Sequence, residues 1–273
     1  MSISAVDFGY VRDLVREKAA IVIEPGKEYL VESRLGLVAR EEGFGSLDLL
    51  VAELRAKPSN GLHRKVVDAM TTNETTFFRD VHPFEALRLQ IVPQLIAARQ
   101  AQRQLSIWCA ACSTGQEPFT IAMILREHFP ALAGWNIRIL ATDLSRDVLA
   151  RARAGRYSQL EVNRGLPARY MIKHFRKEGM EWQIGDSIRE MVEFRELNLI
   201  ESWPGLPLMD VVFMRNVLIY FDVDTKRTIL GKVRRVLRPD GILFLGGAET
   251  TMNLDDAYQR LALGKAVCYR PTA

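Results

Sequence analysis

Apolar residues recur at helical spacing along the first 70 positions of the chain. The run AVDFGYVRDLVREKA predicts one helix, which a Pro-Gly pair at 25–26 follows, and further helices are predicted at 27–43, 46–56 and 60–70. Ser46 stands where a helix N-cap is expected, and Pro58 comes just after the end of the same helix. We therefore expect an all-helical N-terminal domain over residues 1–70.

The pattern changes after residue 70. The stretch TTNETTFFRD at 71–80 is polar and rich in threonine, which indicates a linker with a function of its own, and a helix is predicted at 82–100. Apolar strands at 105–111, 136–143, 209–216 and 241–247 then alternate with helical segments at 116–129, 145–155 and 224–237. Unbroken apolar strands between helices predict an α/β fold with a parallel sheet covered on both faces. A final antiparallel strand is predicted at 264–270.

One section does not follow this alternation. Trp182 and Ile184 on one side of a Gly-Asp pair, and Val192 and Phe194 on the other, alternate with polar residues at period two. This pattern predicts a small antiparallel ribbon. We therefore expect an N-terminal helical domain (1–70), a linker (71–85) and an α/β domain (86–273) with the ribbon inserted at about 173–195.

Composition narrows the class of protein. The formal net charge is +4 and the pI about 9.0, but the 37 Lys and Arg residues form no long basic block, so nucleic-acid binding is not expected. Apolar runs are too short for a membrane span, and the first residues lack the basic-then-apolar layout of a signal peptide. Three cysteines do not suggest a disulfide framework. These features predict a cytoplasmic protein without membrane insertion.

Polar residues follow several of the predicted strands. In open parallel sheets, ligands bind beyond the carboxyl ends of the strands. The stretch AACSTGQE offers small residues and a helix N-terminus, with Glu117 in the first turn, although the GxGxxG fingerprint is missing. Asp143 ends the second strand, where it could accept ribose hydroxyls or cap the next helix, a role open to Ser145 too. Arg215 and Asn216 end the third strand. Cofactor loops and ordinary turns both fit these residues.

The first loop also contains a CxxC pair, Cys109 and Cys112. Zinc needs two further ligands at suitable spacing, and the four histidines form no such cluster. A thioredoxin-like redox motif is a second alternative. We favour the interpretation that both cysteines are small structural residues.

Taken together, four motifs resemble the chemotaxis receptor glutamate methyltransferases, the CheR-type family. They are TTNETTFFRD (71–80), CSTGQEPFTIAM (112–123), ILATDLSRDVLARARAGRY (139–157) and MRNVLIYFD (214–222). The resemblance covers nearly the whole chain. It implies a Rossmann-like S-adenosylmethionine-dependent methyltransferase fold with an N-terminal all-helical domain and a small antiparallel β insertion. It further implies S-adenosylmethionine as cofactor, S-adenosylhomocysteine as product, and a linker that contributes to the active site.

The resemblance also implies roles for individual residues. Asp143 would hold the ribose hydroxyls, and Arg79 and Tyr220 would face the reacting centre as catalytic residues. The cofactor contacts implied are Asn73, Thr75, Arg79, Glu117, Asp143, Asn198, Leu199, Arg215 and Asn216, with Asn198 and Leu199 beside the adenine. The substrates would be the cytoplasmic signalling domains of chemoreceptors. On the second predicted helix, Arg34 and Arg40 fit either a docking site for such an acidic partner or an ordinary solvated helix face. Gln116 departs from the glutamate common in the family. The section 173–195 is shorter than in members that grip a receptor's C-terminal pentapeptide, which argues against such tethering here.

A glutamate side chain suits this chemistry because its pKa of about 4.3 makes it an anionic nucleophile at neutral pH, so no general base is required. Two alternatives stay open. One is a methyltransferase acting on nucleic acid or a small molecule, but the sequence RNVLIYF after the third strand has none of the prolines common in amino-methylating enzymes. The other is a non-catalytic regulator that binds S-adenosylmethionine.

Overall fold

The computed structural model describes residues 3–272, which form two compact units. The first comprises the chain up to Thr72 together with Tyr220–Thr225, and the second comprises Asn73–Ile219 and the chain from Lys226 onward. The second unit therefore contains the α/β part of the chain.

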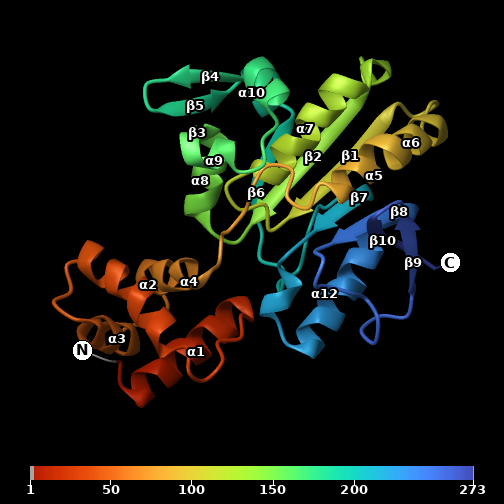
Figure 1. Cartoon of the computed structure of the whole chain (residues 1–273). Helices are drawn as coiled ribbons and strands as arrows, with labels where there is room; N and C mark the ends of the chain where they lie inside the picture. Colours follow the sequence, from red (N-terminus) through yellow and green to blue (C-terminus); the bar gives the residue numbers. More distant parts are fainter. Residues whose placement is uncertain (1–2, 273) are drawn as a thin grey trace. The chain divides into compact units, whose positions relative to one another are not determined.

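The helical unit is built from the segments that the apolar pattern predicts. Its helices are α1 (Ala5–Ala19), α2 (Glu28–Glu41), α3 (Leu47–Ala56) and α4 (Gly61–Met70), drawn in red to orange in Figure 1. The Ser46 hydroxyl accepts a hydrogen bond from Leu49 N, which confirms it as the N-cap of α3. Val15, Leu35 and Leu50 are fully buried in the core between the helices.

A seven-stranded sheet forms the centre of the second unit, in the order β6-β2-β1-β7-β8-β10-β9. Strands β6, β2, β1, β7 and β8 run parallel, while β10 is antiparallel to β8 and β9, so the predicted final antiparallel strand is confirmed. The strands are β1 (Gln104–Ala110), β2 (Asn136–Asp143), β6 (Val192–Glu196), β7 (Met209–Met214), β8 (Leu237–Leu245), β9 (Tyr258–Leu263) and β10 (Ala266–Pro271).

Helices follow the strands of this sheet and cover it (Figure 1). Ile107, Ile139 and Phe213 of the sheet share one buried cluster with residues of α5 and α7. The helix predicted at 82–100 is widened by a π turn (η1) just before Pro93, which has no backbone N–H to donate. The helical elements are α5 (His82–Ala86), η1 (Leu87–Ile91), α6 (Val92–Ala98), α7 (Gln116–His128), η2 (Pro130–Leu132), α8 (Arg146–Ala154), α9 (Gln159–Asn163), α10 (Ala168–His174), α11 (Asp186–Arg189), η3 (Leu218–Tyr220) and α12 (Val223–Val236).

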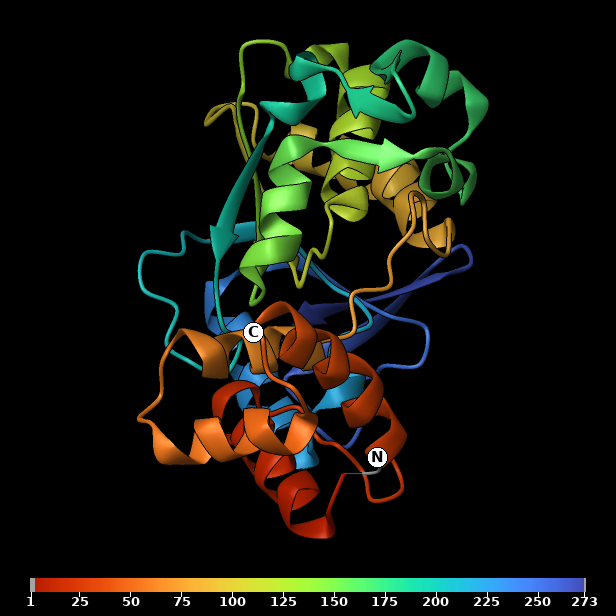
Figure 2. The same ribbon diagram turned by 90° about the vertical axis from the view of Figure 1, so that its left-hand side faces the viewer.

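A small antiparallel sheet, in the order β3-β5-β4, is inserted between β2 and β6 and is drawn in green and teal in Figures 1 and 2. It consists of β3 (Arg156–Ser158), β4 (Phe175–Glu178) and β5 (Glu181–Ile184). The predicted partnership of Trp182 and Ile184 with Val192 and Phe194 is wrong. Val192–Glu196 instead forms β6 of the large sheet, parallel to β2. Alternation at period two marks a strand but does not identify its partner.

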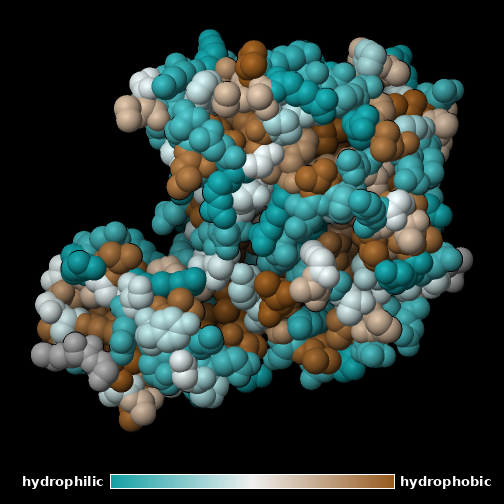
Figure 3. Space-filling view, in the orientation of Figure 1, coloured by the Kyte–Doolittle hydropathy of each residue, from teal (hydrophilic) through white to brown (hydrophobic). Residues whose placement is uncertain are grey.

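The surface carries mixed polar and apolar residues. Figure 3 shows hydrophilic residues over much of the visible face, with apolar residues scattered among them. Within residues 3–272, no helix has the length and apolar character needed to cross a membrane.

Candidate active site

The loop after β1 is held in an unusual backbone conformation. Ala111, Ser113 and Gly115 have φ values of 59°, 51° and 94°, in the left-handed region that favours glycine. A Cβ on Gly115 would lie 3.1 Å from the Ala152 Cβ, so the loop has no room for a side chain there. Helix α7 starts directly afterwards, and no side chain caps its N-terminus. Backbone N–H groups at such a helix start are suited to a polar or anionic ligand group.

Asp143 ties the end of β2 to this loop. One carboxylate oxygen accepts from Ser113 N at 2.8 Å and the other accepts from Ser145 N at 3.1 Å. Ser145 occupies the N-cap position of α8, but its hydroxyl makes no capping bond. Burial raises the pKa of Asp143, and the N–H donors oppose this effect. Each oxygen of a carboxylate has two lone pairs, so Asp143 can accept further bonds from a pair of hydroxyls.

Arg215, directly after β7, joins three elements. Its guanidinium donates to the Glu117 carboxylate at 2.7 Å, to the Asp80 carboxylate at 2.6 Å and to the Arg79 carbonyl at 2.8 Å. The side chain is only 2% exposed. Burial raises the pKa of Glu117, and the charge of Arg215 works against that rise. We call Asp80, Glu117 and Arg215 the clasp, because they fix the 73–80 segment to the start of α7 and the end of β7.

The 73–80 segment contains no helix or strand and is anchored at further points (Figures 1 and 2). The Asn73 carbonyl accepts from the Ser113 hydroxyl at 2.7 Å, and Phe78 N donates to the Thr120 hydroxyl at 3.2 Å. Thr75 is half-buried in the same segment. The Arg79 guanidinium donates to the Glu74 carbonyl at 2.8 Å, and its charge opposes the rise that burial causes in the pKa of Glu117. The segment therefore brings its polar residues to the carboxyl edge of the sheet.

The loop after β6 reaches the same edge. Leu197 N donates to the Asp143 carbonyl at 3.0 Å, which places the following residues next to the end of β2. The Asn198 carbonyl accepts from the Trp203 indole at 3.3 Å. Leu199 is buried, and its carbonyl accepts from the Lys232 ammonium at 2.5 Å. These bonds hold the loop that contains Asn198 and Leu199 in one conformation.

Glu249 is a site residue that the sequence patterns missed. Its carboxylate accepts from the backbone N–H groups of Gly246 at 2.6 Å, Asn216 at 2.8 Å and Val217 at 2.9 Å. Asn216 has a φ of 58°, so this carboxylate fixes a strained turn directly after Arg215. Glu249 follows the end of β8, and the rule that singled out the other strand ends would also have selected it.

Residues from the ends of β1, β2, β6, β7 and β8 thus converge on one edge of the sheet. The family model described as CheR methyltransferase, all-alpha domain, matches residues 6–71, and the model described as CheR methyltransferase, SAM binding domain, matches residues 73–267. The chain belongs to the CheR methyltransferase family. The fold and the family expected from the sequence are confirmed.

Similar proteins align with this CheR family member along nearly its whole length. Chemotaxis protein methyltransferase 1 of Pseudomonas aeruginosa is 42% identical, with 99% of each chain covered. Chemotaxis protein methyltransferase Cher2 of Pseudomonas putida is 40% identical over the same shares. Chemotaxis protein methyltransferase 1 of Vibrio cholerae is 36% identical, with 95% of each chain covered.

S-adenosylmethionine is the cofactor of this methyltransferase domain, and the residues at the carboxyl edge fit it. The tight loop at 111–115 lets a ligand approach the backbone, and Asp143 keeps acceptor capacity for ribose hydroxyls. Arg215 Nε is buried without a hydrogen-bond partner, so a donor is left for an acceptor outside the protein's own network.

The CxxC pair of this CheR family member lies in the core. Cys109 and Cys112 are buried free thiols, and burial raises the pKa of both well above the ordinary range. Both thiols are therefore protonated at neutral pH, whereas nucleophilic and metal-bound cysteines are thiolates. Among residues 3–272, no group of His, Cys, Asp or Glu side chains is arranged to hold a metal ion.

Three other expected site residues belong to the helical unit. The Tyr220 carbonyl accepts a hydrogen bond from Val22 N at 2.9 Å, within that unit. Arg34 is not a free surface cation, because its guanidinium donates to the Met70 and Thr71 carbonyls at 2.7 and 2.8 Å. Burial also lowers the pKa of Arg34. Arg40 is exposed, and its Nε donates to a carbonyl of its own helix.

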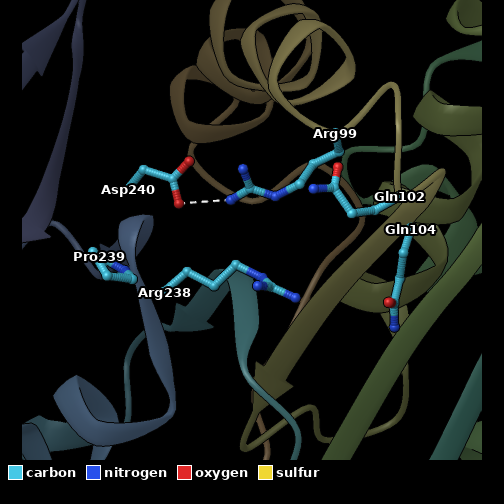
Figure 4. Close-up of a pocket in the computed structure, with 6 residues that line it drawn as sticks. All are labelled: Arg99, Gln102, Gln104, Arg238, Pro239 and Asp240. Carbon is cyan, nitrogen blue, oxygen red and sulfur yellow. Dashed lines mark hydrogen bonds and ion pairs between the residues drawn. The ribbon is translucent and has the colours of Figure 1, made fainter.

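A hollow of about 170 Å³ lies at the opposite edge of the sheet, where β1 and β8 begin (Figure 4). Asp210 is fully buried beside it and accepts from Arg99 Nε at 3.0 Å and Ser106 N at 2.8 Å. Arg99 also donates to Asp240 at 2.6 Å. These arginine–aspartate pairs compensate one another's charge, so we assign them to the stability of the sheet. The residues that line the hollow are Arg99, Gln102, Gln104, Arg238, Pro239 and Asp240.

Proposed function

We propose that this methyltransferase converts specific glutamate side chains of chemoreceptors to glutamyl methyl esters, in chemotaxis signal adaptation. The product left in the site would be S-adenosylhomocysteine. The observation that carries the proposal is the convergence of the clasp, Asp143 and the 111–115 loop on one edge of the sheet, in a chain whose relatives are named chemotaxis protein methyltransferases.

The acceptor explains the kind of residues that gather at this edge. A glutamate carboxylate is ionised at neutral pH, because its ordinary pKa is about 4.3, so the protein does not have to remove a proton. Two of the histidines, which are common general bases, have hydrogen-bond partners of their own: His128 contacts the Tyr170 hydroxyl at 3.0 Å, and His174 contacts the Glu127 carboxylate at 2.8 Å. The sequence after β7 lacks the prolines common in amino-methylating enzymes, which also favours a carboxylate acceptor.

The protein's contribution is alignment and the exclusion of water. S-adenosylmethionine, when bound, supplies a methyl group on a positively charged sulfur. Asp143 holds the ribose hydroxyls, Asn198 and Leu199 flank the adenine, and the clasp keeps the 73–80 segment over the site. Alignment is effective when the reacting atoms approach to about 3–3.5 Å. Burial strengthens the electrostatic interactions in the site by removing solvent.

Arg79 and Tyr220 are the proposed catalytic residues, Arg79 orienting the acceptor or the cofactor and Tyr220 donating a hydrogen bond to the acceptor oxygen. Transfer of labelled methyl groups to a receptor's cytoplasmic domain tests these roles. Arg79→Ala and Tyr220→Phe should each lower kcat on the order of 10- to 100-fold, the effect of losing one hydrogen bond to a charged group. Tyr10→Phe is the control in the helical unit. Full activity of both variants would refute the assignment.

Docking of an acidic receptor helix through α2 is the less direct part of the proposal. Arg40 is available for it, but Arg34 is engaged with the end of α4, so Arg34→Glu would damage the helical unit itself. Arg40→Glu is therefore the informative variant. It should raise the KM for the receptor and leave the affinity for S-adenosylhomocysteine unchanged.

A further inference from the structure

Tyr157 lies outside the residues assigned to the site, yet it contacts the site's loop directly. It belongs to β3 of the small sheet, where it pairs with Trp182 of β5. Its side chain is almost fully buried, with the whole residue 1% exposed. The hydroxyl donates a hydrogen bond to the carbonyl of Thr114 at 2.8 Å. The small sheet is thus tied to the loop between β1 and α7 by one buried bond.

The ring of Tyr157 packs against the other parts that surround the site. It makes an edge-to-face contact with Phe77 of the 73–80 segment at a centroid distance of 5.0 Å. A second contact joins it to Phe119 of α7 at 6.5 Å. Its hydroxyl oxygen lies 3.2 Å from the position that a Cβ on Gly115 would take. Tyr157 therefore fills the space directly behind the loop.

This loop needs external support because of its conformation. Ala111 and Ser113 are non-glycine residues with positive φ, which persist only where surrounding contacts over-determine the backbone. The Thr114 carbonyl lies between Ser113 and the start of α7, and its residue is buried. Without the tyrosine hydroxyl this carbonyl loses its hydrogen-bond donor, and a buried acceptor without a partner is unfavourable.

We propose that Tyr157 is a positioning residue for S-adenosylmethionine, which acts by fixing the 111–115 loop through the Thr114 carbonyl. The inference rests on the assignment of this loop to the cofactor. The Tyr157 hydroxyl stays a neutral donor, since burial raises the pKa of Tyr157 well above the ordinary range. Tyr157 itself does not have to touch the cofactor or the acceptor.

Tyr157→Phe keeps the ring and removes only the hydroxyl. The matched control is Tyr258→Phe, because Tyr258 is also buried and its hydroxyl donates to a backbone carbonyl, that of Leu230, at 2.9 Å. We expect Tyr157→Phe to raise the calorimetric Kd for S-adenosylhomocysteine, and the KM for S-adenosylmethionine, on the order of tenfold. That change corresponds to about 1.4 kcal/mol. Tyr258→Phe should lower the melting temperature and leave the Kd within about twofold of the wild type.

The inference is overturned if the Kd for S-adenosylhomocysteine is unchanged in Tyr157→Phe, or if both variants weaken its binding equally. It is also overturned if Tyr157→Phe lowers kcat without changing Kd or KM. Hydrogen exchange of the wild-type protein supplies a test that does not depend on a variant folding. Binding of S-adenosylhomocysteine should slow exchange in β3 together with the 111–115 loop and leave β9 unchanged. Exchange in β3 that does not respond to the ligand contradicts the inference. A wild-type protein that binds no S-adenosylhomocysteine refutes the proposed function instead.

Discussion

Replacement of Arg215 by methionine should destabilise the α/β unit and detach the 73–80 segment. The side chain is 2% exposed and donates to two carboxylates, of which Glu117 is 13% exposed and Asp80 53% exposed. Asp80 can return to water when Arg215 is lost, whereas Glu117 is left as an uncompensated buried charge. Breaking a buried ion pair in this way costs about 3–5 kcal/mol, and we expect the lower end because one partner is exposed.

Thermal unfolding measures this effect. For a unit of this size, each kcal/mol lowers the melting temperature by about 2–4 °C, so Arg215→Met should lower it by about 6–12 °C. Arg164→Met is the matched control, since Arg164 binds Glu74 of the same segment at 3.0 Å in an exposed pair. Exposed pairs contribute about 0–1 kcal/mol, so this control should barely change the melting temperature.

A double-mutant cycle isolates the buried pair from other effects of the substitution. Glu117→Gln removes the charge that Arg215 compensates, so the combination of Arg215→Met and Glu117→Gln should be at least about 1 kcal/mol more stable than the sum of the single effects predicts. Strictly additive effects, or a loss below about 1 kcal/mol in Arg215→Met, would contradict the role of the clasp.

Two further predictions concern the strand ends. In Glu249→Gln an amide NH2 replaces a carboxylate oxygen that accepts hydrogen bonds from backbone N–H groups of the turn after β7. We expect the free energy of unfolding, measured in urea, to fall by roughly 2 kcal/mol, and methyl transfer to become slower. Normal stability and activity would refute this. Burial raises the pKa of Asp143, so its charge is present above that pKa and lost as the pH falls through it. As the pH is lowered, calorimetry should therefore show the affinity for S-adenosylhomocysteine falling at a pH above about 3.9, the pKa of an ordinary aspartate. Asp143→Asn should bind this ligand weakly and without that pH dependence.

The apolar pattern predicted most helices and strands because burial imposes the period of each element on the sequence. It failed for Val192–Glu196, since alternation is the same whether a strand pairs in a ribbon or at the edge of a larger sheet. It also gave no sign of β9, whose residues Tyr258–Leu263 are largely half-buried or exposed at the sheet's edge. Pairing partners are decided by long-range packing, which a local pattern does not contain.

The candidate site was predictable where residues follow strands and less so where they act through the backbone. Asp143 and Arg215 stand out because charged side chains directly after apolar strands are exceptional. The local pattern does not single out Tyr157, because its proposed role depends on the Thr114 carbonyl, which is 43 residues away in the sequence. Arg34 shows the converse, because a charge on a predicted helix face turned out to bind the end of α4.

The most direct test of the account is the chemical identity of the methylated side chain. The protein is incubated with labelled S-adenosylmethionine and the cytoplasmic domain of a chemoreceptor, and the modified peptides are mapped before and after mild base treatment. The account predicts label on glutamate residues that base releases as methanol, because a glutamyl methyl ester is hydrolysed under these conditions. Label that is stable to base, on a nitrogen of lysine or arginine or on added nucleic acid, would contradict it, as would the absence of transfer to any chemoreceptor.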